Sequence, residues 1–348
     1  MRIMILGGSN SSPKHGWAAE LARIAPEHVF DNKFLGAVGS LFGLLRLLKM
    51  ERDGDPKPDA LIFEYTLNDT VWLAGGSLDP QIIADTLGDV LTFCAREGIG
   101  ILFLCLCLRP HEGQGEAEGS LYLDNIYRTA AEKRGAACLF LADILGHIDA
   151  SQFVDHKHLD GASFCRVAEA VAERLRQPIP TPGGAALSMR FCYADATQSS
   201  ITGPVSRLRR SATVFEGAFV EIARGGRCLW NIRGRLVAAL LRSTEMSGCY
   251  AITAGGRTIR KNAQSLAREA VENLIILHYI AQTLPLGKSV VFDLPTSEEA
   301  LMALPGDLTL MEGAPRVPFE QQTLEVAGIM IYRPASWARR MFEAVSGG

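Results

Sequence analysis

Three short segments of this 348-residue chain carry side chains that could perform nucleophilic catalysis. Gly7-Gly8-Ser9-Asn10-Ser11 follows an apolar stretch at the N-terminus, Thr66-Leu67-Asn68-Asp69 follows another, and Asp155-His156-Lys157-His158 precedes an amphipathic pattern far downstream. A serine hydroxyl is a weak nucleophile until a neighbouring base takes its proton. His158 could be that base, with Asp155 holding the other ring nitrogen. The sequence therefore predicts a triad of Ser9, His158 and Asp155.

N–H groups near Ser9 could stabilise the negative charge that develops on a carbonyl oxygen during attack. We expect three such donors, which are the backbone N–H of Ser9, the backbone N–H of Gly36 and the side-chain amide of Asn68. Gly39 is an equally reasonable source of the glycine N–H, so the choice between Gly36 and Gly39 stays open. Each segment alone also has a plainer interpretation, since Asn68 before Asp69 is typical of a turn.

Strand-like and helix-like segments alternate in the first half of the chain. Short apolar runs predict strands at 2–6, 28–31, 60–65, 100–108 and 137–142, and amphipathic patterns predict helices at 41–48, 82–94, 121–133 and 162–175. This alternation indicates an α/β fold with a parallel sheet between two helix layers. Ser9 and Asn68 both follow strands, so they should meet at the carboxyl edge of the sheet, where such folds bind ligands.

Residues 178–186, rich in Pro and Gly, interrupt this pattern and predict a linker. We therefore expect a catalytic domain over 1–177 and a β-rich, sandwich-like accessory domain over 187–348. The predicted strands of the second domain are 189–197, 213–223, 228–241, 248–253, 289–294 and 324–332. One inserted helix is predicted at 263–284, where apolar residues recur at helical spacing until Pro285.

Charge is distributed unevenly along the chain. Residues 1–178 hold 17 Lys and Arg against 24 Asp and Glu, and the remainder holds 18 against 14. The basic excess consists mostly of arginines, which predict either a salt-bridged surface or a surface that faces anions. The arginines of this basic excess are Arg207, Arg209, Arg210, Arg224, Arg227, Arg233, Arg235, Arg242, Arg257 and Arg260.

Several classes of protein are disfavoured by composition and motif. No basic segment interleaved with aromatics predicts nucleic-acid binding, and no run reaches the roughly 18 apolar residues of a membrane span. The eight cysteines lack Cys-x-x-Cys or Cys/His ligand spacing, so we expect no metal, no cofactor and no disulfide framework. Without a signal-like segment at the N-terminus, the expected location is the cytoplasm.

The order of these segments resembles the SGNH, or GDSL-like, hydrolase family over roughly residues 1–177. That family carries a serine block after strand one, a glycine block after strand two, an Asn-Asp block after strand three and an Asp-x-x-His block before the last helix. The resemblance implies a flavodoxin-like parallel sheet, with Ser9 as nucleophile, His158 as base and then acid, and Asp155 as its partner. Gly8 replaces the family's usual Asp, and Thr66 replaces a usual Gly.

The function that this resemblance implies is a serine esterase that removes a small acyl group. Acetyl fits best with the carbohydrate-active members of the family. An acyltransferase acting on a glycan would use the same residues and is the first alternative. A non-catalytic binding protein built on a hydrolase fold is the second. The accessory domain could hold a glycan, cover the cleft or form a homo-oligomer contact, and the sequence leaves these three roles open.

Overall fold

The chain forms two compact units in a computed structural model that describes residues 1–111, 118–184, 188–211, 215–266 and 274–334. One unit comprises Met1–Gly75 and Asp79–Met189, and the other comprises Gly76–Leu78 and the residues from Arg190 onward. The first residues of the predicted accessory domain and the end of the predicted linker, 185–187, lie outside the described residues. Each unit has its own hydrophobic core.

The first unit is built on a five-stranded parallel sheet of order β2-β1-β3-β4-β5. Its strands are β1 (Arg2–Gly7), β2 (Val29–Asn32), β3 (Ala60–Glu64), β4 (Gly100–Cys105) and β5 (Ala137–Phe140). The predicted flavodoxin-like order and all five predicted strands are confirmed. Every residue of β3 and β4 is buried, as expected for central strands covered on both faces.

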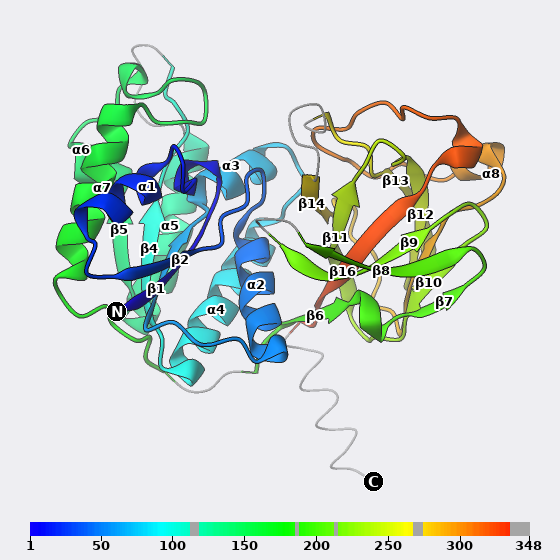
Figure 1. Cartoon of the computed structure of the whole chain (residues 1–348), viewed down its shortest axis with the longest axis horizontal. Helices are drawn as coiled ribbons and strands as arrows, with labels where there is room; N and C mark the ends of the chain where they lie inside the picture. Colours follow the sequence, from blue (N-terminus) through cyan, green and yellow to red (C-terminus); the bar gives the residue numbers. More distant parts are fainter. Residues whose placement is uncertain (112–117, 185–187, 212–214, 267–273, 335–348) are drawn as a thin grey trace, which may run out of the picture. The chain divides into compact units, whose positions relative to one another are not determined.

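Helices cover both faces of this sheet (Figure 1). On one face lie α1 (Trp17–Ile24), α6 (Leu141–Leu145) and α7 (Gly161–Leu175), whose apolar residues share a core cluster with β1, β3 and β4. The other helices are α2 (Ser40–Asp53), α3 (Thr66–Ala74), α4 (Pro80–Glu97) and α5 (Glu118–Arg134). Phe63 and Phe103 of the sheet pack edge to face with each other, and Phe103 also contacts Tyr127 of α5.

Local sequence explains where these helices begin and end. Asp79 caps α4 by accepting a hydrogen bond from the Gln81 N–H, and Pro80 occupies the first helical position. Gly98 then ends α4 in the left-handed region, at φ 70°. Asp160 caps α7 through the Ser163 N–H, which fixes the helix that follows the predicted Asp-x-x-His segment.

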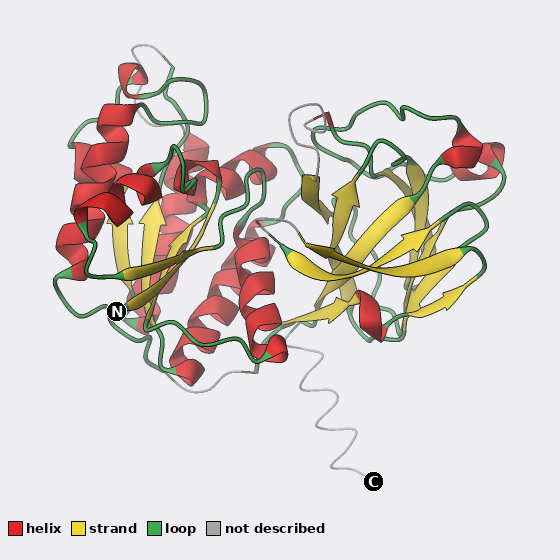
Figure 2. Ribbon diagram, viewed as in Figure 1, coloured by secondary structure: helices red, strands yellow, loops and turns green. Residues whose placement is uncertain are grey.

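The second unit is a β-sandwich, as predicted, with antiparallel sheets shown as strands in Figure 2. The first sheet has the order β13-β12-β15-β10-β7, and the second β14-β11-β16-β9-β8, with β6 also paired to β16. The strands are β6 (Phe191–Asp195), β7 (Ser200–Thr202), β8 (Val205–Ser211), β9 (Glu216–Ile222), β10 (Arg227–Trp230), β11 (Arg235–Ser243), β12 (Cys249–Ala254), β13 (Arg257–Asn262), β14 (Leu274–Tyr279), β15 (Val290–Asp293) and β16 (Leu324–Tyr332).

The predicted helix at 263–284 is wrong where the structure describes it. Residues 274–279 form β14, which pairs antiparallel with β11 from Ala238↔Tyr279 to Ser243↔Leu274. Residues 267–273 of the predicted helix lie outside the described residues. The apolar run Leu-Ile-Ile-Leu fits a buried strand as well as a helix, and pairing with β11 decides the outcome. A short helix, α8 (Glu298–Met302), occurs elsewhere in this unit.

The single strand predicted at 228–241 is two strands in different sheets. Gly234 separates β10 from β11 with φ at 141°, and a Cβ on it would lie 2.3 Å from Ile331 Cγ2. Only glycine fits this backbone conformation and this contact, which lets the chain pass from one sheet to the other.

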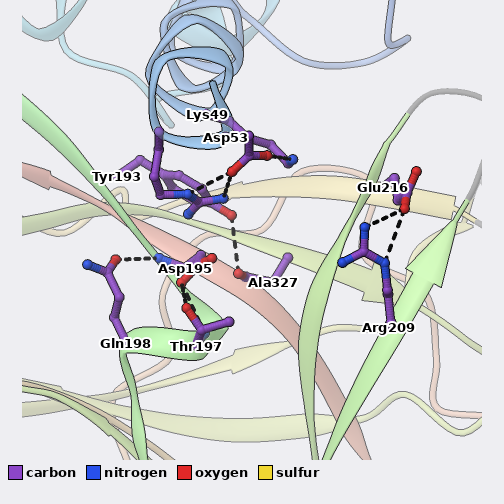
Figure 3. Close-up of polar contacts among 10 residues, drawn as sticks. Lys49, Asp53, Tyr193, Asp195, Thr197, Gln198, Arg209, Glu216 and Ala327 are labelled. Carbon is purple, nitrogen blue, oxygen red and sulfur yellow. Dashed lines mark hydrogen bonds and ion pairs between the residues drawn. The ribbon is translucent and has the colours of Figure 1, made fainter. Parts of the chain in front are cut away.

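Arginines of the second unit are mostly paired within it, which favours the salt-bridged interpretation. Arg209 of β8 forms an ion pair with Glu216 of β9, which Figure 3 shows across the neighbouring strands. Glu325, almost fully buried, accepts from both Arg210 and Arg242. Arg224 donates to the Phe319 and Cys249 carbonyls. These guanidinium groups stabilise the sandwich, and the structure gives the anion-facing interpretation no support at these positions.

Three further features of the described residues bear on function. No helix among them is both long enough and apolar enough to cross a bilayer. Within the same residues, no group of three or more His, Cys, Asp or Glu side chains is placed to hold a metal ion. All eight cysteines are free thiols.

Candidate active site

Ser9 lies directly beyond β1, at the carboxyl edge of the first unit's sheet. It begins a single 3₁₀ turn, Ser9–Ser11, in which the Ser12 N–H donates to the Ser9 carbonyl. A Cβ on Gly7 would lie 2.2 Å from Ser11 Oγ. The turn therefore packs so tightly on the end of β1 that glycine is required there, and the position of the Ser9 hydroxyl is fixed.

The structure brings Ser9, His158 and Asp155 together. Ser9 Oγ lies 2.8 Å from His158 Nε2, across 149 residues of sequence. His158 Nδ1 lies 2.7 Å from Asp155 Oδ2. With Nδ1 protonated and donating to the carboxylate, Nε2 is the acceptor that faces the hydroxyl, as a base must be.

The loop around Asp155 holds the imidazole in this orientation. Asp155 Oδ1 accepts the backbone N–H groups of Lys157 and His158, while Oδ2 contacts the ring. Partial burial acts to raise the Asp155 pKa, but the hydrogen bonds from His158 and the two backbone N–H groups lower it to about 2. Asp155 is therefore a carboxylate throughout the neutral range and stabilises a positive charge on the ring.

Asn10 has a role that the sequence did not reveal. Its Nδ2 donates to the Lys157 carbonyl at 2.9 Å, and its Oδ1 accepts from the Leu159 N–H at 3.3 Å. The side chain is almost completely buried. Asn10 therefore holds the backbone on both sides of His158 against the turn that carries Ser9. Its place beside Ser9 in the serine segment was the only available signal.

Gly36 lies beside the nucleophile. Leu35 donates its N–H to the Gly7 carbonyl, which extends the chain beyond β2 alongside the end of β1. A Cβ on Gly36 would lie 3.7 Å from the Ser9 Cβ. Gly39 instead occupies the N-cap position of α2. Of the two glycines, Gly36 is the one that lies close to Ser9, so it fits the predicted oxyanion donor better.

Asn68 lies in the first turn of α3, a helix that the sequence analysis did not predict. Its side chain is mostly buried and approaches Gly8, where a Cβ would lie 2.1 Å from Asn68 Oδ1. This contact explains why glycine occupies position 8. The Asn68 amide makes no hydrogen bond with any residue in the described part of the chain, so its N–H₂ is available to a ligand beside Ser9.

Asp69 has a structural role next to Asn68. Its Oδ1 accepts from the Ser40 N–H at the start of α2, and its Oδ2 accepts from the Tyr127 hydroxyl of α5. Burial raises the pKa of Asp69 to about 6. Asp69 therefore joins α2, α3 and α5 and fixes the helix turn from which Asn68 projects.

Glu64, at the end of β3, lies beneath the serine turn and is completely buried. Its Oε2 accepts from Ser11 Oγ at 2.8 Å and from the Gly8 N–H at 3.2 Å, and its Oε1 has no partner in the structure. Burial raises its pKa to about 8, partly offset by these two hydrogen bonds. A protonated Glu64 therefore supports the turn at neutral pH.

Comparison with solved structures identifies the same architecture elsewhere. The chain is similar to the crystal structure of a two-domain esterase (CEX) active on acetylated mannans, co-crystallised with mannopentaose. The TM-score is 0.61 at 14% identity, over 96% of this chain and 91% of that one. The two proteins share the same two-domain fold. A second crystal structure of a two-domain esterase (CEX) active on acetylated mannans gives a TM-score of 0.60 at 13% identity, over 96% of this chain and 92% of that one.

A further match covers about half of the chain. The crystal structure of TesA has a TM-score of 0.43 at 22% identity, over 51% of this chain and 98% of that one. No protein-family model matches the sequence, and no curated protein matches it either. The comparison with the two-domain esterase confirms the predicted fold, a parallel α/β sheet followed by a β-sandwich.

Proposed function

We propose that this protein is a serine esterase that hydrolyses acetyl esters of a carbohydrate through an acyl-Ser9 intermediate. The observation that carries the proposal is the hydrogen-bonded series Ser9 Oγ, His158 Nε2, His158 Nδ1 and Asp155 Oδ2. Such a series activates a hydroxyl for attack on an ester carbonyl. Gly36 lies near the Ser9 Cβ and the Asn68 amide lies near Gly8, so both are within the surroundings of the nucleophile where we assign the oxyanion donors.

In the first half of the reaction, His158 Nε2 removes the hydroxyl proton as Ser9 Oγ bonds to the ester carbonyl carbon. The negative charge on the carbonyl oxygen is stabilised by the N–H groups of Ser9, Gly36 and Asn68. His158 then gives its proton to the leaving sugar oxygen, the carbon–oxygen bond breaks, and acetyl remains on Ser9. Asp155 stabilises the imidazolium during this step.

In the second half, water replaces the departed sugar. The water oxygen attacks the acetyl carbonyl carbon while His158 removes a proton from the water. The same three donors stabilise the oxyanion. The bond to Ser9 Oγ then breaks, the imidazolium returns the proton to Oγ, and acetate leaves. No redox partner or external cofactor enters this balance.

The choice of substrate class rests on the fold comparison. A structure that shares both units belongs to an esterase active on acetylated mannans, which supports an acetylated polysaccharide or oligosaccharide as substrate. Transfer of the acetyl group to a sugar hydroxyl would use the same acyl-enzyme and replaces only the attacking water.

The direct test compares Ser9→Ala with Ser12→Ala, a matched change at a neighbouring hydroxyl that contacts neither His158 nor Asp155. We expect Ser9→Ala to lower p-nitrophenyl acetate turnover by at least about 10³-fold, and Ser12→Ala to retain it. Acetate release from O-acetylated mannan and xylan oligosaccharides should follow the same order. Full turnover by the folded Ser9→Ala protein would refute the proposal, and acetylated acceptor sugar in place of acetate would indicate a transferase.

A further inference from the structure

A hollow of about 230 Å³ opens at the carboxyl edge of the first unit's sheet. Its lining residues are Arg109, Pro110, His111 and His156. Arg109 lies on the segment that follows β4, and His156 lies on the loop that carries the triad. The Arg109 N–H donates to the His156 carbonyl at 3.1 Å, so the two sides of the hollow are joined through their backbones.

This hollow lies beside the loop that carries His158. His156 is two residues from His158, so their Cα atoms are at most about 7.6 Å apart. His158 in turn contacts Ser9 Oγ. The loop between Phe153 and Leu159 is closed by a bridge between these two residues and is clamped by Asn10. One wall of the hollow is therefore formed by a held loop that also carries Asp155 and His158.

Among the described residues, the lining is rich in hydrogen-bond donors and includes no carboxylate. A guanidinium and two imidazoles surround the hollow, and their side chains make no hydrogen bond or ion pair with other described residues. Two described acids on the same loops, Asp149 and Asp155, already accept hydrogen bonds. Asp155 accepts from His158 and from two backbone N–H groups, and Asp149 accepts from the Ser151 N–H. The hydrogen bonds from Ser151 lower the Asp149 pKa most, and the charge of Arg109 also acts to lower it.

We propose that this hollow is a subsite for a carboxylate on the ester substrate. The inference rests on the proposed esterase function and narrows its substrate class to acidic esters. The planar guanidinium of Arg109 matches a carboxylate through two parallel hydrogen bonds, and each imidazole adds a donor. The carboxylate can belong to the alcohol part, as in an acetylated uronic acid, or to the acyl part, as in a dicarboxylic acid hemiester.

The test compares charged and neutral substrates in two pairs. The alcohol pair is O-acetyl methyl glucuronoside against O-acetyl methyl glucoside, and the acyl pair is mono-p-nitrophenyl succinate against p-nitrophenyl butyrate. We expect the wild-type kcat/KM to favour the charged member of one pair by about tenfold or more, and that pair reveals the source of the carboxylate. The preference should decrease as salt is added, because the hollow is open to solvent.

Arg109→Gln should abolish this preference, mainly by raising KM for the charged substrate, and leave p-nitrophenyl acetate turnover within about twofold. The matched control is Arg23→Gln, which removes an exposed arginine paired with Glu20 on α1 and should keep the preference. Equal kcat/KM within both pairs, or a preference that survives Arg109→Gln, would overturn the subsite. Failure of the wild type to hydrolyse p-nitrophenyl acetate would instead refute the esterase function.

Discussion

Asn10 connects the turn that contains Ser9 to the loop that contains His158. Its two hydrogen bonds hold the backbone on either side of His158, while Asp155 holds the ring itself. The distance between Ser9 Oγ and His158 Nε2 therefore depends on a side chain that takes no part in the chemistry. Asn10 is a positioning residue, and its loss should alter rate constants more than substrate binding.

Asn10→Ala should lower kcat by about tenfold or more with little change in KM, because the loop loses two buried hydrogen bonds, each typically about 1 kcal/mol. The rate at which a fluorophosphonate labels Ser9 should decrease in parallel. Asn10→Asp keeps the acceptor for the Leu159 N–H and should lose less activity. A purely structural role for Asn10 predicts a lower melting temperature with unchanged kcat in the folded fraction.

Glu64 should make the stability of the protein dependent on pH. In the unfolded chain it ionises near its ordinary value of 4.5, but in the folded protein burial raises its pKa to about 8. Between these values the folded state binds more protons, so stability should decrease as pH rises through this window. Asp69, with a pKa of about 6, acts in the same direction over a smaller range.

Glu64→Gln should remove most of this dependence, since glutamine stays neutral and can still accept from Ser11 and Gly8. We expect the free energy of unfolding of the wild type to fall by on the order of a few kcal/mol from pH 5 to pH 8, and that of the variant to fall much less. Urea denaturation at both pH values measures the difference. Equal decreases in the two proteins would contradict the assignment of a protonated Glu64.

At the scale of the elements, helix packing against the sheet depends on close approach at single positions. Gly43 of α2 lies over β3, where a Cβ would be 2.4 Å from Phe63 Cε2 and 2.7 Å from Tyr65 Cε2. Gly88 of α4 is also helical, but a Cβ there would have no neighbour within 4 Å. The two glycines form a matched pair in opposite environments.

Gly43→Ala should destabilise the protein by about 1–3 kcal/mol, because overpacking outweighs the gain in helix propensity. Gly88→Ala should stabilise it by up to about 1 kcal/mol. Chemical denaturation of both variants measures the two changes. A stabilising effect at Gly43 would show that α2 does not pack on β3 as described.

Sequence patterns predicted the first unit better than the second, for physical reasons. Parallel strands such as β3 and β4 are buried on both faces, so they read as continuous apolar runs. Strand β8 reads Val-Ser-Arg-Leu-Arg-Arg-Ser, and its pairing with β9 and the ion pair to Glu216 stabilise a sequence without an apolar face. The apolar run of β14 is compatible with both a buried helix and a buried strand. Its pairing with β11, which local sequence does not reveal, makes it a strand.

The order of the motifs in the sequence predicted those residues of the candidate site that carry reactive groups. Ser9, Asp155 and His158 were named from residue type and position, and the structure brings them within hydrogen-bond distance. The supporting residues could not be found in this way. Glu64 lies 53 residues from Ser11, and Asn10 lies 147 residues from Lys157, so their roles exist only in the folded chain.

At the scale of the whole molecule, the combination of an α/β unit and a β-sandwich also occurs in another protein, because a single similar structure covers 96% of the chain. Within the sandwich, arginines such as Arg209, Arg210 and Arg242 pair with acids of the same unit. Their charge stabilises the sandwich, whereas Arg109 of the first unit lines the hollow beside the loop that carries His156. We therefore expect selectivity for acidic substrates to depend on Arg109 and not on these three arginines.

The central claim is that Ser9 is the nucleophile, activated by His158. The most direct measurement is reaction with a fluorophosphonate followed by mass spectrometric mapping of the modified residue. The proposed mechanism predicts one label on Ser9, formed rapidly by the wild type and by Ser12→Ala, and at least about 10²-fold more slowly by His158→Ala. A label on another residue, or labelling of Ser9 at the same rate without His158, would contradict it.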